Sequence, residues 1–422
     1  MAGVRKVFSN NQTSKQSSNL ILAHQGGPWR GRQHTDTARA GHSHLGAFFH
    51  EELLYTVGLT KLDLVGPVLG RELLNYFGSA KAVFHCSQRE LLSLPGIGPK
   101  TASSILKGRS LLGAERELKF AEKRGIKVLT ILDPEYPEGL KEIYDAPLVI
   151  YTRGGYNFGS QPMISIVGTR MPSEYGRIVA QNFTEYFVDQ GFCVVSGLAF
   201  GIDATVHRKV LERGGNTVAV LGHGFGTLYP QEHWREAQGI CKTGALVTEF
   251  GSDVLPEARN FPMRNRIISG LSHATIVIEA GDKGGALITA RSAFEQNRLV
   301  YAIPGDLTRS QAQGSNALIR DQIAKMVLHP SEVVDELEPS IGHLLETKIS
   351  IPKPSVTVSQ EELSILEILS GEPQRVTSLS KKAGSSMGRL RALLIRLEVE
   401  GLVRKEVGGI YYVTSIKGVT AA

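Results

Sequence analysis

The residues with the clearest chemical potential are two arginines that flank an asparagine in the segment Phe261–Leu271. Arg264, Asn265 and Arg266 precede a helical, apolar run, and a strand-like segment, Ala245–Phe250, lies upstream of them. Two permanent cations and an amide at the entry to a helix suit a phosphate ester, because guanidinium groups pair with phosphate oxygens and helix N-termini attract anions. A surface loop with solvated arginines would carry the same residues. The residues at the ends of the neighbouring strands are therefore needed to distinguish the two interpretations.

The region from about 115 to 335 alternates short strands with long helices, which is typical of a doubly wound, Rossmann-like α/β domain with a mainly parallel sheet. Helical stretches such as 176–190 and 286–297 separate the strands. The predicted strands are short, apolar and β-branched, and they are Met163–Gly168, Gly191–Ser196, Thr217–Leu221, Ala245–Phe250, Thr275–Glu279 and Leu299–Ile303. Because ligands of such sheets bind at the carboxyl ends of the strands, we expect the residues after each strand to line one crevice.

These strand ends carry glycines, hydroxyl groups and cations. Glycines leave backbone N–H groups accessible, and helix starts direct partial positive charge toward the crevice. The sequence therefore predicts a phosphate-binding crevice whose contacts are Gly168, Thr169, Arg170, Ser196, Gly197, Arg264, Asn265, Arg266, Lys283, Gly284 and Gly285. Aromatic side chains at the same ends are candidates for stacking on unpaired bases, namely Phe200, Phe225 and Tyr229.

Residues for catalysis are fewer. Asp203 and His207 are four positions apart on one helix face, and Glu279 ends another strand, so acid–base chemistry is one interpretation. The interpretation that we favour has Asp203 capping the helix and His207 bonded to a nearby carbonyl. No G-x-G-x-x-G follows the first strand, and the sequence contains no P-loop, G-x-S-x-G elbow or H-E-x-x-H motif. We predict no catalysis, no cofactor and no metal site.

A second candidate contact lies in the short helices of residues 46–112. Its segment Leu94–Ala102 places two glycines around an apolar residue, directly before a helix. Gly96 and Gly98 allow a phosphate to approach the backbone, and Lys100 adds charge at the helix start. The pattern resembles the helix-hairpin-helix motif of DNA-binding proteins, although such a hairpin can also serve only to pack two helices. A degraded earlier copy begins at Val65.

The flanking segments differ in composition. Residues 1–45 carry six Lys or Arg against one acid among Gln, Asn, Ser and Gly, which predicts a disordered basic tail. Residues 336–357, with three prolines, are typical of a linker. Residues 358–416 show three helices and a hairpin in winged-helix order. Arg389, Arg391 and Arg396 of the third helix suit a phosphate backbone, but nearby acids leave a protein-binding role equally open.

The bulk composition sets limits on class and compartment. The 422 residues are 41% hydrophobic and 21% charged with a net charge of +6, which suits a soluble multi-domain protein and permits a polyanionic partner. Three dispersed cysteines form no CxxC pair, which fits the reducing cytoplasm. No run approaches the roughly 18 apolar residues of a membrane span, and the start lacks the apolar core of a signal peptide, so we predict a cytoplasmic protein without membrane contact.

Several motifs together resemble the DprA/Smf family of bacterial DNA-processing proteins. They are Ser196-Gly197-Leu198-Ala199-x-Gly201-Ile202-Asp203 with His207, Val218-Ala219-Val220-Leu221-Gly222-x-Gly224 with Tyr229-Pro230, Phe261-Pro262-x-Arg264-Asn265-Arg266-Ile267-Ile268-x-Gly270-Leu271, and Gly285-x-Leu287-Ile288-Thr289-Ala290 with Pro304-Gly305. The resemblance covers residues ~130–325. It implies an extended Rossmann-like domain between a SAM-like (helix-hairpin-helix) and a winged-helix domain. It also implies binding and protection of incoming single-stranded DNA, dimerisation through the Rossmann-like domain, loading of RecA recombinase during natural transformation, and no established catalysis.

The chain departs from that family at a few positions and leaves two other classes open. Phe200 stands where several relatives carry Lys or Arg, Gly226 where Asp is common, and His233 where Asn is common. The glycine-lined crevice also resembles that of the Lonely-guy-type nucleotide phosphoribohydrolases, yet Gly284–Ala290 lacks their Gly-Thr pair and the following Glu. A scaffold whose winged helix docks a partner is the third class, and it predicts no nucleic-acid affinity of the central domain.

Overall fold

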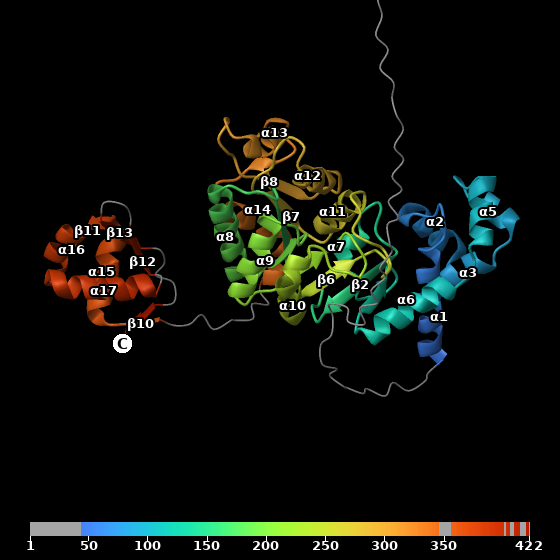
Figure 1. The fold of residues 1–422 in the computed structure, drawn as a ribbon, viewed down its shortest axis with the longest axis horizontal. Helices are drawn as coiled ribbons and strands as arrows, with labels where there is room; N and C mark the ends of the chain where they lie inside the picture. Colours follow the sequence, from blue (N-terminus) through green and yellow to red (C-terminus); the bar gives the residue numbers. More distant parts are fainter. Residues whose placement is uncertain (1–43, 346–355, 401, 406–408, 414–418, 422) are drawn as a thin grey trace, which may run out of the picture. The chain divides into compact units, whose positions relative to one another are not determined.

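The computed structural model describes residues 44–345, 356–400, 402–405, 409–413 and 419–421 (Figure 1). The chain divides into two compact units, residues 1–347 and 348–422. The predicted tail, apart from its last two residues, lies outside the described residues. Among those residues, no helix combines the length and the apolar character needed to cross a membrane.

The first unit is built on one nine-stranded sheet, which confirms the predicted doubly wound fold. Its strand order is β1-β2-β6-β5-β4-β3-β7-β8-β9, and the seven strands from β6 to β9 are parallel. The bounds are β1 Lys127–Thr130, β2 Val149–Gly154, β3 Met163–Val167, β4 Cys193–Ser196, β5 Thr217–Val220, β6 Ala245–Thr248, β7 Ala274–Val277, β8 Leu299–Ala302 and β9 Lys325–Met326. All six predicted strands are present, and the antiparallel pair β1–β2 extends the sheet beyond β6.

The helices between the strands cover both faces of the sheet. Their bounds are α7 Glu138–Lys141, α8 Glu174–Asp189, α9 Ile202–Glu212, η1 Gln231–His233, α10 Trp234–Thr243, α11 Asn260–Gly270, α12 Gly285–Glu295, η2 Ser310–Ala312, α13 Gln313–Arg320 and α14 Pro330–Leu345. Phe187 of α8 and Val206 of α9 pack with Ile164 and Ile166 of β3, while Ile267 of α11 packs in a separate cluster. The crevice at the carboxyl ends of the strands therefore lies between helices of both layers.

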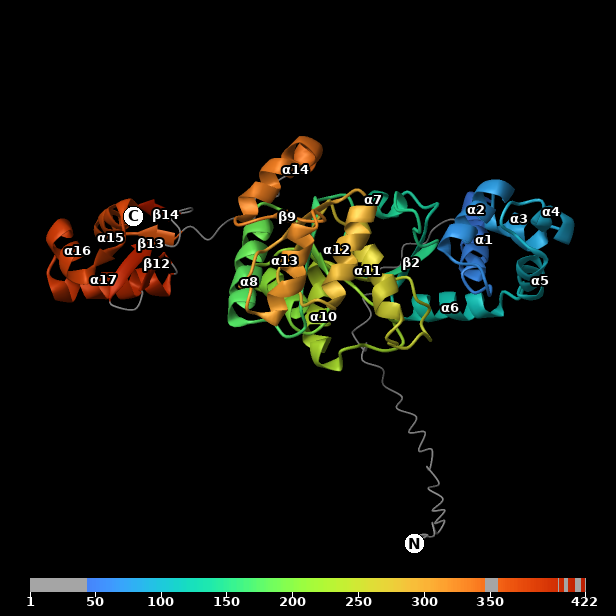
Figure 2. The same ribbon diagram turned by 90° about the horizontal axis from the view of Figure 1, so that it is seen from above.

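The prediction that a linker begins at residue 336 is wrong, because the helix α14 continues through this position. Pro339 lies inside this helix, which continues to Leu345 (Figure 2). Val333, Leu337 and Ile341 are buried at a spacing of four residues, so burial of this apolar stripe compensates for the hydrogen bond that the proline removes. Residues 346–355 of the predicted linker lie outside the described residues.

The N-terminal helices contain both hairpins that the sequence suggested. Their bounds are α1 His44–Leu59, α2 Pro67–Phe77, α3 Ala80–His85, α4 Gln88–Leu92, α5 Pro99–Lys107 and α6 Leu112–Lys123. Gly96 adopts a left-handed backbone with φ 87°, and Leu64 takes the same place in the first hairpin with φ 65°. In both copies a glycine caps the next helix and a proline begins it. The degraded copy thus folds like the intact one, at the cost of backbone strain at Leu64.

Replacing Leu64 by Asn is expected to stabilise the protein. A left-handed leucine is unfavourable by about 1–2 kcal/mol, whereas Asn tolerates this conformation, so we expect a gain of about 0.5–1 kcal/mol after the lost apolar contacts are subtracted. Leu132, which also lies in a turn, is 55% exposed against 56% for Leu64 and provides the control substitution. Urea denaturation measures both variants, and equal changes in midpoint would contradict a conformational cause.

The second unit has the predicted winged-helix order. Its elements are β10 Val356–Val358, α15 Gln360–Gly371, β11 Gln374–Arg375, α16 Val376–Ala383, α17 Met387–Val399, β12 Val403–Lys405, β13 Ile410–Val413 and β14 Val419–Ala421. Two of the three arginines on α17 are ion-paired, Arg389 with Glu361 at 2.8 Å and Arg396 with Glu362 at 3.3 Å. These pairs join α17 to α15 and reduce the positive charge that the helix offers to a phosphate backbone.

Candidate functional site

Near the end of β3, the crevice exposes a cation beside aromatic rings. Arg170, which follows β3, is exposed, and its guanidinium carbon lies 5.7 Å from the ring centroid of Phe261. The Tyr229 ring lies 5.8 Å from the same centroid. Phe200 and Tyr229 are each 41% exposed. We call Arg170, Phe200, Tyr229 and Phe261 the crevice rim, and its composition suits a phosphate beside an unpaired base.

The third predicted stacking residue lies elsewhere. Phe225 is 2% exposed and belongs to the hydrophobic core, so its assignment as a stacking residue is wrong. The glycines on either side are bonded to a neighbouring loop, Gly224 N–H to the Val254 carbonyl at 2.9 Å and Gly226 N–H to that of Ser252 at 3.0 Å. These bonds hold the loop against the body of the protein and leave the Phe225 ring enclosed.

Arg264 lies in the interior and not on the crevice floor. It is 4% exposed, and its guanidinium group donates to the carbonyls of Gly197 (2.8 Å) and Val220. Burial lowers the pKa of Arg264 to about 10. The helix α11 begins at Asn260, so Arg264 is in its second turn and faces the sheet. Its prediction as a phosphate ligand is replaced by a structural role at the ends of β4 and β5.

Asp203 binds the loop that follows β4, the loop whose Gly197 carbonyl accepts a hydrogen bond from Arg264. Its carboxylate accepts hydrogen bonds from the N–H groups of Gly197 (3.1 Å) and Ala199 (3.4 Å). Burial raises the pKa of Asp203, while Arg264 counteracts that rise. Leu198, which lies between Gly197 and Ala199 in the chain, is fully buried and has a left-handed φ of 55°. Arg264 and Asp203 therefore fix a strained loop that ends at Phe200, and they position this rim residue.

The neighbours of Arg264 are also engaged within the protein. Arg266 is ion-paired with Glu249 at 2.5 Å and with Asp145 at 3.1 Å, and it is 7% exposed. Asn265 donates its amide N–H to the Gly285 carbonyl at 3.2 Å, which ties α11 to the start of α12. Arg266, like Arg264, is thus placed inside the fold, and the guanidinium groups of both residues are bound to other groups of the protein.

The remaining predicted contacts divide by burial. Ser196 is fully buried and donates to the Ile166 carbonyl at 2.8 Å, and Gly197 is buried beneath its loop. Gly168 and Thr169 are half-buried beside the exposed Arg170. At α12, Gly284 is the N-cap residue without a side-chain cap, and Lys283 and Gly285 are exposed. The surface groups that remain for a phosphate are therefore Arg170 with Thr169, and Lys283 with the N–H groups of α12.

The residues considered for catalysis are enclosed. His207 is fully buried, and its Nδ1 lies 2.8 Å from the Thr217 hydroxyl, not from the carbonyl that we expected. Because that hydroxyl donates to the Val194 carbonyl at 2.6 Å, Nδ1 of His207 carries the proton and donates to the hydroxyl, while the buried Nε2 is unprotonated. Burial lowers the pKa of His207 to about 3, so the ring stays neutral at physiological pH. Glu279 is likewise buried and is bonded to Ser173.

Two further predicted features can be located. Gly96, Gly98 and Lys100 of the second hairpin are exposed, as a contact with DNA requires. His233, one of the departures from the family, is buried, donates from Nδ1 to the Leu198 carbonyl (2.9 Å), and packs against Phe200 with ring centroids 4.9 Å apart. Within the described part of the chain, no three His, Cys, Asp or Glu side chains gather closely enough to hold a metal ion.

Sequence comparison identifies three regions of the chain. The family model for DNA recombination-mediator protein A matches residues 127–338, that for a SAM-like helix-hairpin-helix tandem matches residues 57–109, and that for the DprA winged helix domain matches residues 351–409. The protein Smf of Synechocystis is 32% identical over 391 residues, which cover 85% of this chain and 98% of that protein. The DNA processing protein DprA of Bacillus subtilis is 40% identical over 223 residues, which cover 53% of this chain and 75% of that protein.

A solved structure supports the same relationship. The X-ray structure of DNA processing protein A from Streptococcus pneumoniae has a TM-score of 0.59 and 29% sequence identity, and the match covers 67% of this chain and 97% of that chain. The match with Smf extends over nearly the whole of that protein, and the family models cover the central sheet and both flanking domains. The chain therefore belongs to the DprA/Smf family, with a SAM-like helix-hairpin-helix domain before the Rossmann-like domain and a winged helix after it.

Proposed function

We propose that this chain binds single-stranded DNA at the crevice rim and processes incoming DNA during natural transformation. The observation that supports the proposal best is the exposed Arg170 beside the half-exposed rings of Phe200 and Tyr229. A cation next to accessible aromatic rings suits a strand whose bases are unpaired, because every base offers a face for stacking. The names of the relatives from Bacillus subtilis and Streptococcus pneumoniae, both DNA processing proteins, agree with this role.

The role in recombination extends this proposal. We infer that the bound strand is protected from degradation and passed to the RecA recombinase, without catalysis by the chain itself. The description of the matching family as a recombination mediator supports the inference. The crevice rim favours contacts with phosphates and base faces over base edges, so binding should depend little on sequence.

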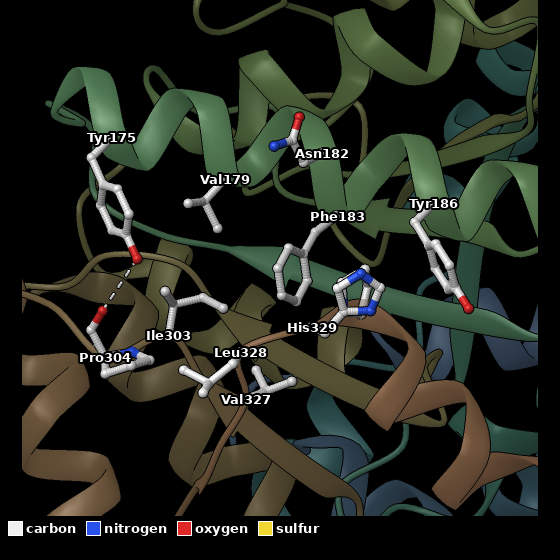
Figure 3. Close-up of a pocket in the computed structure, with 11 residues that line it drawn as sticks. Tyr175, Val179, Asn182, Phe183, Tyr186, Ile303, Pro304, Val327, Leu328 and His329 are labelled. Atoms are coloured by element: carbon white, nitrogen blue, oxygen red, sulfur yellow. Dashed lines mark hydrogen bonds between the residues drawn. The ribbon is translucent and has the colours of Figure 1, made fainter. Parts of the chain in front are cut away.

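We also propose that two copies associate through the edge of the sheet. β9 is the last strand of the sheet, and Lys325 and Met326 are exposed there. Beside it, α8 and the segment after β9 form a groove of about 290 Å³ with aromatic and aliphatic walls (Figure 3). The walls include Tyr175, Phe183 and Leu328. An edge strand next to an apolar groove favours pairing with a second copy of the same surface.

A salt titration of DNA binding tests the main proposal. The full-length protein is mixed with a fluorescent single-stranded oligonucleotide and with the matching duplex over a range of salt concentrations. We expect tighter binding of the single strand and an affinity that falls steeply with salt, because counterions are released from neutralised phosphates. Equal or tighter binding of the duplex would move the site to the hairpins or to the winged helix. Release of free base from nucleoside monophosphates would support the phosphoribohydrolase class instead.

A further inference from the structure

The N-terminus of α8 already holds an anion that the chain itself supplies. Glu279 accepts hydrogen bonds from the backbone N–H of Ser173 (2.9 Å) and from the Ser173 hydroxyl (2.5 Å). That hydroxyl in turn accepts the N–H of Gly176 at 3.0 Å and caps the helix. Because Glu279 is only 4% exposed, these donors and the positive end of the helix stabilise its carboxylate in place of water.

A glycine provides the space for this carboxylate. A methyl group placed on Gly176 would lie 2.3 Å from Oε2 of Glu279. In dinucleotide-binding folds, glycines at the start of the first helix let a phosphate approach the backbone. Gly176 leaves the same kind of space at the start of α8, and the side chain of Glu279 fills it.

The carboxylate of Glu279 lies where doubly wound proteins that bind nucleotides hold a phosphate. β3 lies between β4 and β7, so the strand order reverses at β3. The helix α8 follows β3, and Glu279 follows β7, on the far side of this reversal. In doubly wound sheets the crevice at the reversal binds nucleotides, with the phosphates at the N-terminus of the helix after the first strand. Glu279 thus reaches across the reversal to the position where those phosphates would bind.

We propose that Glu279 determines specificity by closing the crevice to mononucleotides and dinucleotides. Its carboxylate takes both the volume and the hydrogen-bond donors that a nucleotide phosphate would need, and it repels a second anion. The phosphates of a DNA strand are left to Arg170 on the rim and to the start of α12. This assignment of strand phosphates rests on the proposed function, whereas the closure at α8 rests on the contacts of Glu279 alone.

Thermal unfolding of the full-length Glu279→Ala variant tests the proposal, with formate and inorganic phosphate as probes against chloride at equal ionic strength. The alanine variant loses the carboxylate but keeps the donors of Ser173. Formate or phosphate at ten times its Kd should raise the Tm of the variant by about 3 °C, and it should leave the wild type unchanged. AMP should raise the Tm of the alanine variant as phosphate does, and a variant that responds to phosphate but not to AMP would contradict a role of Glu279 in excluding nucleotides.

The Glu279→Gln variant is the matched control, because it removes the charge but still fills the space. We expect its Tm not to respond to either anion. An equal response of the Gln and Ala variants, or a folded alanine variant that does not respond, would overturn the proposal. If the alanine variant does not fold in chloride, the yield of folded protein in formate and in chloride gives the same comparison, and equal yields count against it. Weak single-strand binding by the wild type would contradict the proposed function and leave this result unaffected.

Discussion

The Arg170→Ala variant is expected to bind single-stranded DNA about tenfold more weakly than the wild type, because one charge-assisted phosphate contact is worth about 1.5–3 kcal/mol before competing contacts compensate. Arg170 is the exposed cation at the end of the central strand β3, and it lies against Phe261 on the rim. The loss should be similar for oligonucleotides of different sequence, since a phosphate contact carries no base information. Fluorescence anisotropy at several salt concentrations measures both the affinity and its salt dependence.

The salt dependence separates a direct contact from an indirect one. Loss of one phosphate contact should reduce the slope of log K against log salt by about 0.7 for a single strand. Arg213 lies at the C-terminal end of α9, at the opposite end of the strands, where it is paired with Glu185 and Asp189, and it provides the control Arg213→Ala. We expect that control to retain both affinity and slope. An unchanged slope in Arg170→Ala, with unchanged affinity, would remove Arg170 from the interface.

The Arg264→Leu variant is expected to lose about 3–5 kcal/mol of the free energy of unfolding, the range for leaving a buried charge without the opposite charge that compensates it. Asp203 would remain buried without its counter-cation, and the carbonyls of Gly197 and Val220 would lose their donor. The loop with the left-handed Leu198 would also lose its support. Urea denaturation measures the change, provided that the transition is cooperative.

A double variant shows whether the pair is the cause. Asp203→Asn combined with Arg264→Leu removes both charges, so the combined loss should be clearly smaller than the sum of the two single losses. DNA binding by Arg264→Leu is measured without denaturant, at a temperature where this variant remains folded. Its loss of DNA affinity relative to the wild type should be smaller than that of Arg170→Ala. A variant of nearly wild-type stability that no longer binds DNA would instead restore Arg264 as a direct phosphate ligand.

The sequence by itself determined the architecture of this protein. Short apolar, β-branched runs, most of them leading into Gly, Ser or Pro, predicted all six strands from β3 to β8, because a strand buried on both faces must be apolar along its length and the chain must turn where it leaves the sheet. The hairpin at Gly96 and Gly98 and the order of the winged helix were local patterns as well. The sequence also placed Arg170, Phe200 and Tyr229 at strand ends, where the structure exposes them.

Only the tertiary structure decided which polar groups meet a ligand and which meet the protein. A guanidinium group satisfies a phosphate or a buried carbonyl equally well, and the carbonyl that Arg264 binds belongs to Gly197, 67 residues away in the chain. Glu279 likewise binds Ser173, 106 residues away in the chain, and its carboxylate therefore occupies a crevice of the kind that binds nucleotides in other doubly wound proteins. Residue types report what a group can bind, whereas packing fixes what lies within its reach, and the pairing of distant strands determines that packing.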